Sequence, residues 1–317
     1  MTADRGPSVP TIGDRGRRLL RLADTRGIIV GIAIDHRDSF RATLAGRGIE
    51  DRTDDDLREI KLRLARALAP AATAIMLDEE LGGRAIDEGA VPSSVGLIMP
   101  LEAQGDDQTG DNRLTTLMAS FTPEDAHARG AAACKVLVPY RPDIPSTAAK
   151  QDDLIRAAVA ASHRVGLPLV VEPVVYRRSM EDVAAFGEAY PSLVVAATAR
   201  IAALGPDLLK LPFPVGETVP PTSAEAQAAS RRLDDATRGV PWVLLGGGVD
   251  AETFLDQVQV AGAAGASGFL AGRGIWGPAL HRDPDVVERR AVAIARPLLE
   301  RCRLAVERVA RPLPAAA

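Results

Sequence analysis

The amino-acid sequence predicts the α/β class and, within it, a single (β/α)8 TIM barrel. Short apolar runs rich in β-branched residues alternate with stretches of helical periodicity, a pattern typical of α/β proteins. Eight such runs occur, and eight strand-and-helix units in about 250 residues match the size of this barrel. Glycines cluster after the last two runs, whereas a doubly wound sheet carries its glycine-rich turn after the first strand.

The predicted strands and helices follow one another along the whole chain. The eight strands are expected at residues 28–34, 74–77, 95–99, 134–138, 168–172, 207–212, 241–245 and 267–271. Apolar residues at helical spacing, with Asp, Thr or Ser near several of the starts, predict helices between them. These helices cover residues 54–68, 151–165, 181–190, 193–204 and 223–237. Segment 101–120 is polar and rich in Gly and Asp, so we expect a long loop over the top face.

One catalytic domain is expected over residues 21–310, with tails at residues 1–20 and 311–317. The 317 residues, 46% of them hydrophobic, suffice for one well-buried core. No apolar run approaches the roughly 18 residues needed to span a bilayer, and the N-terminus lacks the apolar core of a secretory signal. We therefore expect a cytoplasmic protein with no membrane partner. Cys134 and Cys302 are too few for a disulfide framework and are expected to be buried.

The charge pattern indicates what the protein binds. The net charge is −4 and no block of Lys or Arg stands out, so nucleic acid is not expected as a partner. A small-molecule ligand is expected instead, and barrels of this kind often form homo-oligomers. The four histidines are scattered, without the spacing of metal ligands, so neither a metal nor an organic cofactor is expected.

Lysine is rare in this chain, which makes each lysine informative. Of 38 basic residues only four are lysines, and Lys210 lies inside the apolar run 207–212. A buried lysine needs a reason, because desolvation disfavours its charged form and yields the amine that condenses with a carbonyl. Lys210 is therefore a candidate for forming a Schiff base. The alternative is a lysine at a strand end whose amine reaches water or pairs with a carboxylate.

Three further ionisable residues are expected to surround Lys210. Lys135 repeats the pattern of a lysine within an apolar strand and is a candidate for steadying an anionic group of the substrate. Glu172 and Asp35 end two strands, so they point into the mouth of a barrel. Glu172 is the preferred proton carrier, and Asp35 the group that orients Lys210 or a substrate hydroxyl. Ion pairs of Lys135 with either carboxylate, which close the mouth, are the alternative.

Two late glycine-rich segments predict a phosphate site. Residues 244–250 (LLGGGVD) and 271–277 (AGRGIWG) follow the seventh and eighth strands, where many barrel enzymes bind phosphate. Glycine backbones allow close approach of an anion, and Arg273 supplies a guanidinium for its oxygens. Tight turns into the following helices are the alternative. His36 and Arg37 are candidates for binding a phosphate or sulfonate at the far end of a sugar.

The chain resembles the class I aldolases related to tagatose 1,6-bisphosphate aldolase, a group that includes sulfofructose-phosphate aldolases. It is also similar to the aldolase-like domain of some bacterial inositol-catabolism kinases. Two departures from the family pattern stand out: the family's D-Q-R-G is Asp-His-Arg-Asp over residues 35–38, and Gly246 stands where relatives often have Ser. The resemblance covers residues 28 to 280 and is carried, in order, by AIDHR, CKVLVPYRPD, VVEPVVY, DLLKLPFPV, WVLLGGGVD and GFLAGRGIWG.

The resemblance implies reversible retro-aldol cleavage of a phosphorylated ketose to dihydroxyacetone phosphate, or a related three-carbon unit, and an aldehyde. The ketose would be similar to tagatose bisphosphate, to sulfofructose phosphate or to a deoxy-keto acid phosphate from inositol. A catalytically weak regulatory protein that binds sugar phosphates is the alternative function. The resemblance implies that Lys210 forms the Schiff base, that Glu172 carries protons, and that Asp35 and Lys135 complete the cluster. It further implies that phosphate is held by the backbones of Gly247, Gly248 and Gly272 and by the side chain of Arg273.

Overall fold

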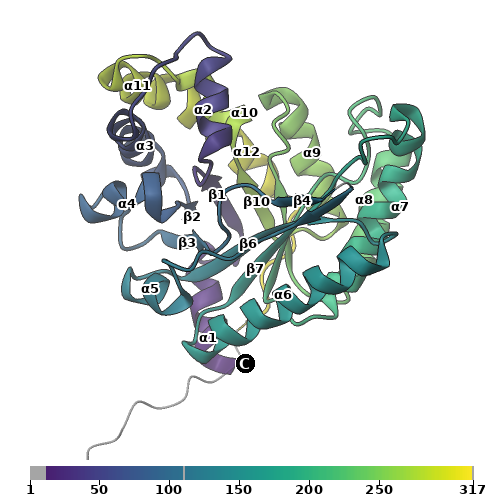
Figure 1. Ribbon diagram of the computed structural model, residues 1–317. Coiled ribbons are helices and arrows are strands. Elements are labelled where there is room, and N and C mark those ends of the chain that lie inside the picture. Colours follow the sequence, from purple (N-terminus) through teal and green to yellow (C-terminus); the bar gives the residue numbers. More distant parts are fainter. Residues whose placement is uncertain (1–11, 110, 316–317) are drawn as a thin grey trace, which may run out of the picture.

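The computed structural model describes residues 12–109 and 111–315, which fold around a closed barrel of parallel strands (Figure 1). Neighbouring barrel strands follow the order β1-β10-β9-β8-β7-β6-β3-β2. The first and last barrel strands along the chain, β1 and β10, pair with each other, and β1 also pairs with β2, so the sheet is closed. The predicted (β/α)8 barrel is thereby confirmed. All eight predicted runs became barrel strands. They are β1 (Ile29–Ala33), β2 (Ala74–Met76), β3 (Gly96–Pro100), β6 (Ala133–Tyr140), β7 (Leu169–Val175), β8 (Leu208–Leu211), β9 (Trp242–Leu245) and β10 (Gly268–Ala271).

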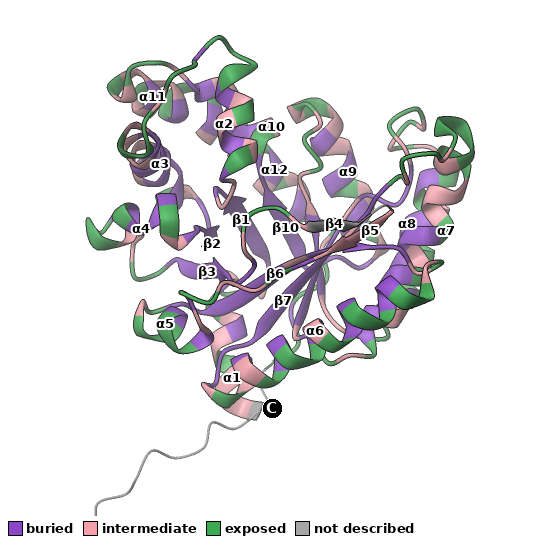
Figure 2. Cartoon of the chain, viewed as in Figure 1, coloured by how far each residue is buried: buried purple, intermediate pink, exposed green. Residues whose placement is uncertain are grey.

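Helices cover the outside of the barrel and turn their buried side toward the strands (Figure 2). The buried residues on that side are largely apolar. Several begin at a side chain that caps the free amides of the first turn, as Thr53 does for α3 and Ser223 for α8. No helix in the described part of the chain is long and apolar enough to cross a membrane. The α-helices are α1 (Ile12–Leu20), α2 (Asp38–Ala45), α3 (Asp54–Leu68), α4 (Glu79–Asp87), α5 (Pro123–Ala128), α6 (Pro145–Arg164), α7 (Val183–Ala202), α8 (Ala224–Ala236), α9 (Ala251–Ala264), α10 (Arg273–Trp276), α11 (Pro284–Arg290) and α12 (Arg296–Val306).

The strands alternate between two apolar clusters, and this alternation positions the site. One cluster lies between strands and helices, and the other fills the interior of the barrel. Ala133 of β6, Val170 of β7 and Leu208 of β8 belong to the interior cluster. Two residues further along each strand the inward position is taken by an ionisable side chain instead of an apolar one. These three side chains are Lys135, Glu172 and Lys210.

Segment 101–120 is more ordered than the long loop expected from its composition. It forms an antiparallel hairpin of β4 (Asp107–Thr109) and β5 (Asn112–Leu114), and Glu102 forms an isolated bridge with Leu117. Buried Gln151 of α6 donates hydrogen bonds to the carbonyls of Pro139 (3.0 Å) and Arg113 (3.3 Å), which anchors the hairpin. The hairpin therefore borders the top of the barrel at a fixed place.

Part of each expected tail is ordered. Residues 12–20 form α1, which lies below the barrel near the C-terminal end (Figure 1), while residues 1–11 lie outside the described residues. Leu19 and Leu22 join the interior cluster, and they cover the apolar side chains at the lower end of the barrel. Within 311–317, Leu313 joins the same cluster and its amide donates to the carbonyl of Gly27 at 2.9 Å. The polar composition of these segments conceals their few apolar contacts.

The two helices expected at 181–190 and 193–204 form one continuous helix, α7. Pro191 lies inside this helix, although proline lacks the amide that a helix interior uses. Leu193 and Val194 after the proline are buried against the core, and this packing outweighs the lost hydrogen bond. The helix therefore continues across the proline.

Candidate active site

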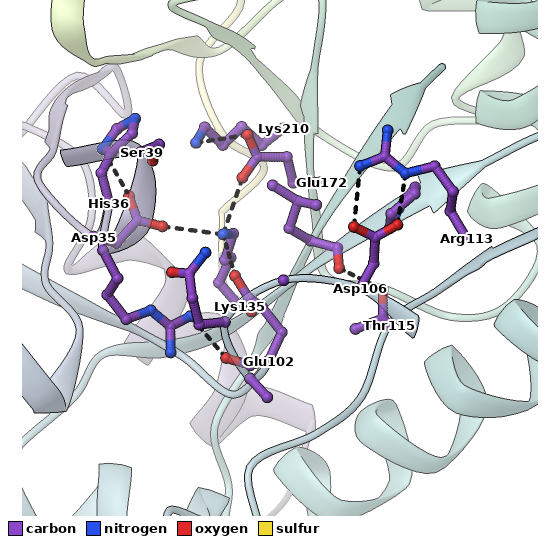
Figure 3. Close-up of a pocket in the computed structure, with 16 residues that line it drawn as sticks. Asp35, His36, Ser39, Glu102, Asp106, Arg113, Thr115, Lys135, Glu172 and Lys210 are labelled. Atoms are coloured by element: carbon purple, nitrogen blue, oxygen red, sulfur yellow. Dashed lines mark hydrogen bonds and ion pairs between the residues drawn. The ribbon is translucent and has the colours of Figure 1, made fainter. Parts of the chain in front are cut away.

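The predicted catalytic residues meet at the carboxyl ends of the strands, inside the barrel mouth (Figure 3). Lys135, Glu172 and Lys210 stand on the adjacent strands β6, β7 and β8. Asp35 follows β1 on the inward register, because the Ile34 amide still donates to the Met76 carbonyl at 2.9 Å and prolongs the strand. Lys135, Glu172 and Lys210 are buried, with exposed fractions of 2%, 6% and 5%.

Lys135 is enclosed by carboxylates. Its Nζ lies 3.0 Å from Oδ2 of Asp35 and 3.2 Å from Oε2 of Glu172, and it also donates to Oε1 of Glu102 (Figure 3). Both ion pairs expected as the alternative for Lys135 are therefore present. Burial opposes the charge of Lys135, but the three carboxylates outweigh burial and raise its pKa well above the ordinary value. Lys135 is a fixed ammonium group at the centre of the cluster.

Lys210 has a different environment from Lys135. Its Nζ lies 2.9 Å from Oε1 of Glu172, which is its one ion pair within the described part of the chain. Asp35 forms its ion pair with Lys135 and none with Lys210, so the prediction that it orients Lys210 or a substrate hydroxyl stays a prediction. Glu172 bridges the two lysines, one through each carboxylate oxygen. Lys210 is thus the less constrained of the two amines, with a carboxylate beside it.

The carboxylates of the cluster differ in their readiness to ionise. Burial raises the pKa of Asp35 and of Glu172, but the charges of Lys135 and Lys210 outweigh it and lower both pKa values. Burial instead dominates at Glu102 and raises its pKa, although Lys135 opposes the shift. Asp35 and Glu172 are therefore ionised near neutral pH.

His36 and Arg37, expected at the far end of the substrate, both lie at the cluster. His36 packs edge-on against Trp276, with ring centroids 5.4 Å apart, and its Nδ1 lies 3.7 Å from Oδ1 of Asp35. Burial lowers the pKa of His36 to about 4, so the ring is neutral near pH 7. Arg37 is buried and donates from Nη2 to the carbonyl of Glu102 at 2.8 Å. Asp38 is exposed and lines neither of the cavities described below.

The predicted phosphate site lies on the other side of Lys210. Gly247 and Gly248 adopt positive φ angles of 56° and 84°, which favour glycine and turn the backbone between β9 and α9. A Cβ atom at Gly248 would lie 3.5 Å from Nη2 of Arg273, so this guanidinium borders the turn. A Cβ atom at Gly272 would lie 3.4 Å from Cε1 of His36. Arg273 makes no ion pair with any described carboxylate and is exposed.

Two cavities meet at Lys210, and we name them by their outer walls. The glycine lobe, about 380 Å³, is lined by Gly246, Gly247, Gly248, Gly272 and Arg273. The hairpin lobe, about 220 Å³, is lined by Asp35, Arg37, Glu102, Asp106, Arg113 and Lys135. His36, Ser39, Leu137, Glu172 and Lys210 belong to both lobes. An elongated ligand that lies across Lys210 can occupy both.

Sequence reasoning missed the residues that the hairpin brings to the site. Glu102 follows β3 by two residues, so it shares the position after a strand that singled out Asp35 and could have been found. Asp106 and Arg113 face each other across the hairpin, with Nε to Oδ2 at 2.5 Å and Nη2 to Oδ1 at 3.0 Å. Their meeting depends on the hairpin, which the polar composition of 101–120 did not predict.

Neither cysteine lines the two cavities. Cys134 and Cys302 are buried free thiols, as expected, and burial raises the pKa of each to about 12. Among the residues that the structure describes, no group of three His, Cys, Asp or Glu side chains is arranged to hold a metal ion.

The sequence matches known proteins across the barrel. A family model described as DeoC/LacD family aldolase matches residues 29–277. Tagatose 1,6-diphosphate aldolase of Listeria monocytogenes is 30% identical over 275 residues, which cover 81% of this chain and 80% of that protein. The protein of the same name from Streptococcus pneumoniae is 30% identical over 285 residues, covering 82% of this chain and 83% of its own length.

Solved structures share the fold. A fructose-bisphosphate aldolase from Slackia heliotrinireducens superposes with a TM-score of 0.64 at 18% identity and covers 97% of this chain and 95% of its own. An archaeal fructose 1,6-bisphosphate aldolase superposes with a TM-score of 0.56 at 22% identity, over 90% of this chain and 99% of its own. At these identities the superpositions support the barrel.

Proposed function

This chain belongs to the DeoC/LacD family of aldolases, and from that premise we propose that it cleaves a phosphorylated ketose through a Schiff base on Lys210. The curated relatives act on tagatose 1,6-diphosphate, which makes a ketose phosphate the substrate class to test first. The products would be dihydroxyacetone phosphate, or a related three-carbon unit, and an aldehyde. The reaction would be reversible.

One observation carries the proposal: a buried lysine with a carboxylate at 2.9 Å stands where two cavities meet. Lys135 is held as an ammonium by three carboxylates and is poorly suited to attack a carbonyl. Lys210 has one carboxylate partner, so transfer of a proton to Glu172 or to solvent would free its amine. Of the two inward lysines, Lys210 is the better nucleophile.

The proposed reaction follows from these positions. The amine of Lys210 adds to the ketone, and loss of water from the carbinolamine leaves a protonated imine. As the C4 hydroxyl loses its proton the C3–C4 bond breaks, the aldehyde leaves, and the electron pair moves to the imine nitrogen to form an enamine. Protonation at C3 and hydrolysis then release the three-carbon phosphate and the amine. Glu172, at 2.9 Å from Nζ of Lys210, would carry the protons of dehydration and enamine protonation.

The remaining residues would orient the substrate. The phosphate is proposed to bind in the glycine lobe, against the backbones of Gly247, Gly248 and Gly272 and the side chain of Arg273. The open guanidinium of Arg273 and the turned glycine backbones support this assignment. In the hairpin lobe, Asp35 and Lys135 would bind substrate hydroxyls, and His36 and Arg37 would contact the far end.

Borohydride trapping tests the Schiff base directly. Borohydride added together with dihydroxyacetone phosphate reduces an imine to a stable amine, and mass spectrometry of the digested protein locates it. The chain has four lysines, at 61, 135, 150 and 210, so the label is assigned without ambiguity. We expect the adduct on Lys210. An adduct elsewhere, or none at all, would overturn the mechanism.

Matched variants complete the test. Lys210→Arg keeps a cation at the site and should abolish both the adduct and turnover, whereas Lys150→Arg changes an exposed lysine and should preserve both. A panel of ketose phosphates assayed for cleavage, alongside thermal-shift binding, distinguishes an enzyme from a regulatory protein. Stabilisation by ligands without cleavage of any of them would favour the regulatory alternative.

A further inference from the structure

We propose that the substrate is a ketose monophosphate, because the hairpin lobe is built to receive hydroxyl groups and to exclude a second phosphate. The pair of Asp106 and Arg113 is the element that decides this. The inference rests on the proposed function, since it assigns the far half of the ketose whose carbonyl Lys210 would attack. It distinguishes this chain from relatives whose named substrate carries two phosphates.

The two lobes differ in charge. The glycine lobe has the exposed guanidinium of Arg273, and its only described carboxylate is Glu172, which is shared and already bound to Lys210. The described lining of the hairpin lobe has four acidic and four basic side chains, so no positive charge is in excess there. A phosphate dianion therefore has a favourable place on one side of Lys210 only.

Arg113 would be the natural ligand of a second phosphate, but its Nε and Nη2 donors are already used. Its Nε and Nη2 form a two-pronged pair with the carboxylate of Asp106, at 2.5 and 3.0 Å (Figure 3). Its guanidinium also lies 5.2 Å from the centre of the Tyr176 ring. The two donors that could bind two phosphate oxygens therefore bind the carboxylate of Asp106 instead.

The other cations of the hairpin lobe are also engaged. Lys135 contacts three carboxylates, and Arg37 is fixed by the Glu102 carbonyl at 2.8 Å and by Sδ of Met118 at 3.6 Å. Arg37 is buried, so it cannot turn toward a ligand without losing these contacts. A second phosphate bound through Lys135 or through either Nη atom of Arg37 would require an existing contact to break, and the one donor of Arg37 without a partner among the described atoms, Nε, is buried.

Glu102 supplies the positive argument for hydroxyl groups. This side chain is 7% exposed and lines the hairpin lobe, and its Oε1 accepts a hydrogen bond from Nζ of Lys135. Its Oε2 is buried and has no hydrogen-bond partner among the described atoms. A sugar hydroxyl can donate to that oxygen, whereas a phosphate would set a negative charge against it.

Substrate comparison tests the proposal. The probes are fructose and tagatose, each as the 1-phosphate and as the 1,6-bisphosphate, assayed for aldehyde release. We expect the wild-type kcat/KM to favour the monophosphates by about tenfold, since one unfavourable charge contact has that order of effect. A wild-type preference for the bisphosphates would overturn the proposal.

Charge variants locate the cause. Asp106→Asn frees Arg113 and should raise the bisphosphate-to-monophosphate ratio of kcat/KM by about tenfold. The double variant Asp106→Asn with Arg113→Gln should lose that gain. Asp111→Asn makes the same charge change on the same hairpin, at a side chain bound to Ser179 and outside both cavities, so its ratio should equal the wild-type ratio. A D106N ratio unchanged from wild type would contradict the assigned role.

The test of substrate preference can fail independently of the test of the Schiff base. Trapping with dihydroxyacetone phosphate uses only the glycine lobe and Lys210, so it does not depend on the far half of the ketose. An adduct on Lys210 combined with a preference for bisphosphates would remove this inference and leave the proposed function intact. Absence of the adduct would remove the proposed function itself.

Discussion

At the scale of residues, two lysines of similar burial have different environments. Lys135 is surrounded by Asp35, Glu102 and Glu172, which together hold its proton, while Lys210 shares only Glu172. A buried ammonium is costly unless it is paired, so the carboxylates around Lys135 offset its desolvation. Of these two lysines, Lys210 has the fewer ion pairs. The proposal that Lys210 is the nucleophile therefore rests on how the carboxylates are distributed around the two lysines.

Replacement of Glu172 tests its proton-carrying role. Glu172→Gln keeps the size and a hydrogen-bond acceptor near Lys210 but cannot carry a proton, so kcat should fall by about 100-fold or more. Steady-state cleavage assays measure the loss, and borohydride trapping should still label Lys210, more slowly. Glu188→Gln, on the exposed part of α7, serves as the control. A Glu172→Gln enzyme with wild-type kcat would refute the assigned role.

His36 should make stability depend on pH. Burial lowers the pKa of His36 from 6.5 to about 4, so the unfolded chain takes up the proton first as the pH falls. The stabilisation is complete above pH 6.5 and is lost between pH 6.5 and 4, amounting to about 3 kcal/mol. His36→Gln should lose far less free energy of unfolding across this range. Urea unfolding at several pH values measures it, and parallel profiles for the two proteins would contradict the prediction.

At the scale of elements, β1, β6, β7 and β8 each position one ionisable side chain of the site, and two loops line the two lobes. The turn between β9 and α9 depends on backbone geometry, since Gly248 has a φ of 84° and lies beside Arg273. The hairpin β4–β5 shapes the other lobe and is anchored through Gln151. The strands therefore fix the positions of Asp35, Lys135, Glu172 and Lys210, and the two loops line the cavities on either side of Lys210.

Gly248→Ala should weaken phosphate binding. Alanine is strained at this φ by about 1 kcal/mol, and its Cβ would occupy the space beside the guanidinium of Arg273. We expect the KM for the phosphorylated substrate to rise about tenfold. Gly239→Ala is the matched control, because Gly239 has a φ of 85° with nothing within 4 Å of an added Cβ. Both variants should lose similar stability in thermal melts. If KM rose equally in Gly239→Ala and Gly248→Ala, the rise would be due to backbone strain and not to a lost phosphate contact.

At the scale of the whole molecule, the barrel is open at one end and plugged at the other. Leu19, Leu22 and Leu313 come from opposite ends of the described chain and join the interior cluster under the strands. The ionisable groups of the site lie at the opposite end of the same strands, at their carboxyl ends. The inward-pointing side chains therefore form two groups along the barrel axis: an apolar cluster at one end and the ionisable cluster of the candidate site at the other.

Removal of the plug should affect stability and leave the chemistry unchanged. Leu313→Ala creates a cavity at a side chain that is 5% exposed, so the free energy of unfolding should fall by about 2 to 3 kcal/mol. Leu304→Ala, at a leucine of α12 that is 51% exposed, should cost less than about 0.5 kcal/mol. Urea unfolding measures both, and kcat of the folded protein should be unchanged. A fall in kcat for Leu313→Ala would show that the two ends are coupled.

Local pattern was enough to predict the strands and the inward residues. Lys210 and Lys135 stood out because a lysine inside an apolar strand is unusual, and the alternation of a strand fixes the side to which it points. Segment 101–120 was predicted less well, because polar residues with many glycines suit a loop and a short hairpin equally. The order of α1 was missed for a related reason: its few apolar contacts form only with a barrel already closed above them.

The sequence by itself determined the barrel and the residues that end its strands, since both follow from periodicity and from order along the chain. Only the tertiary structure decided which charges pair. Lys135 meets Asp35 from β1, Glu102 from beyond β3 and Glu172 from β7, groups that are separated by 100, 33 and 37 positions. Electrostatic energy depends on distance in space and on burial, and neither is given by separation along the chain.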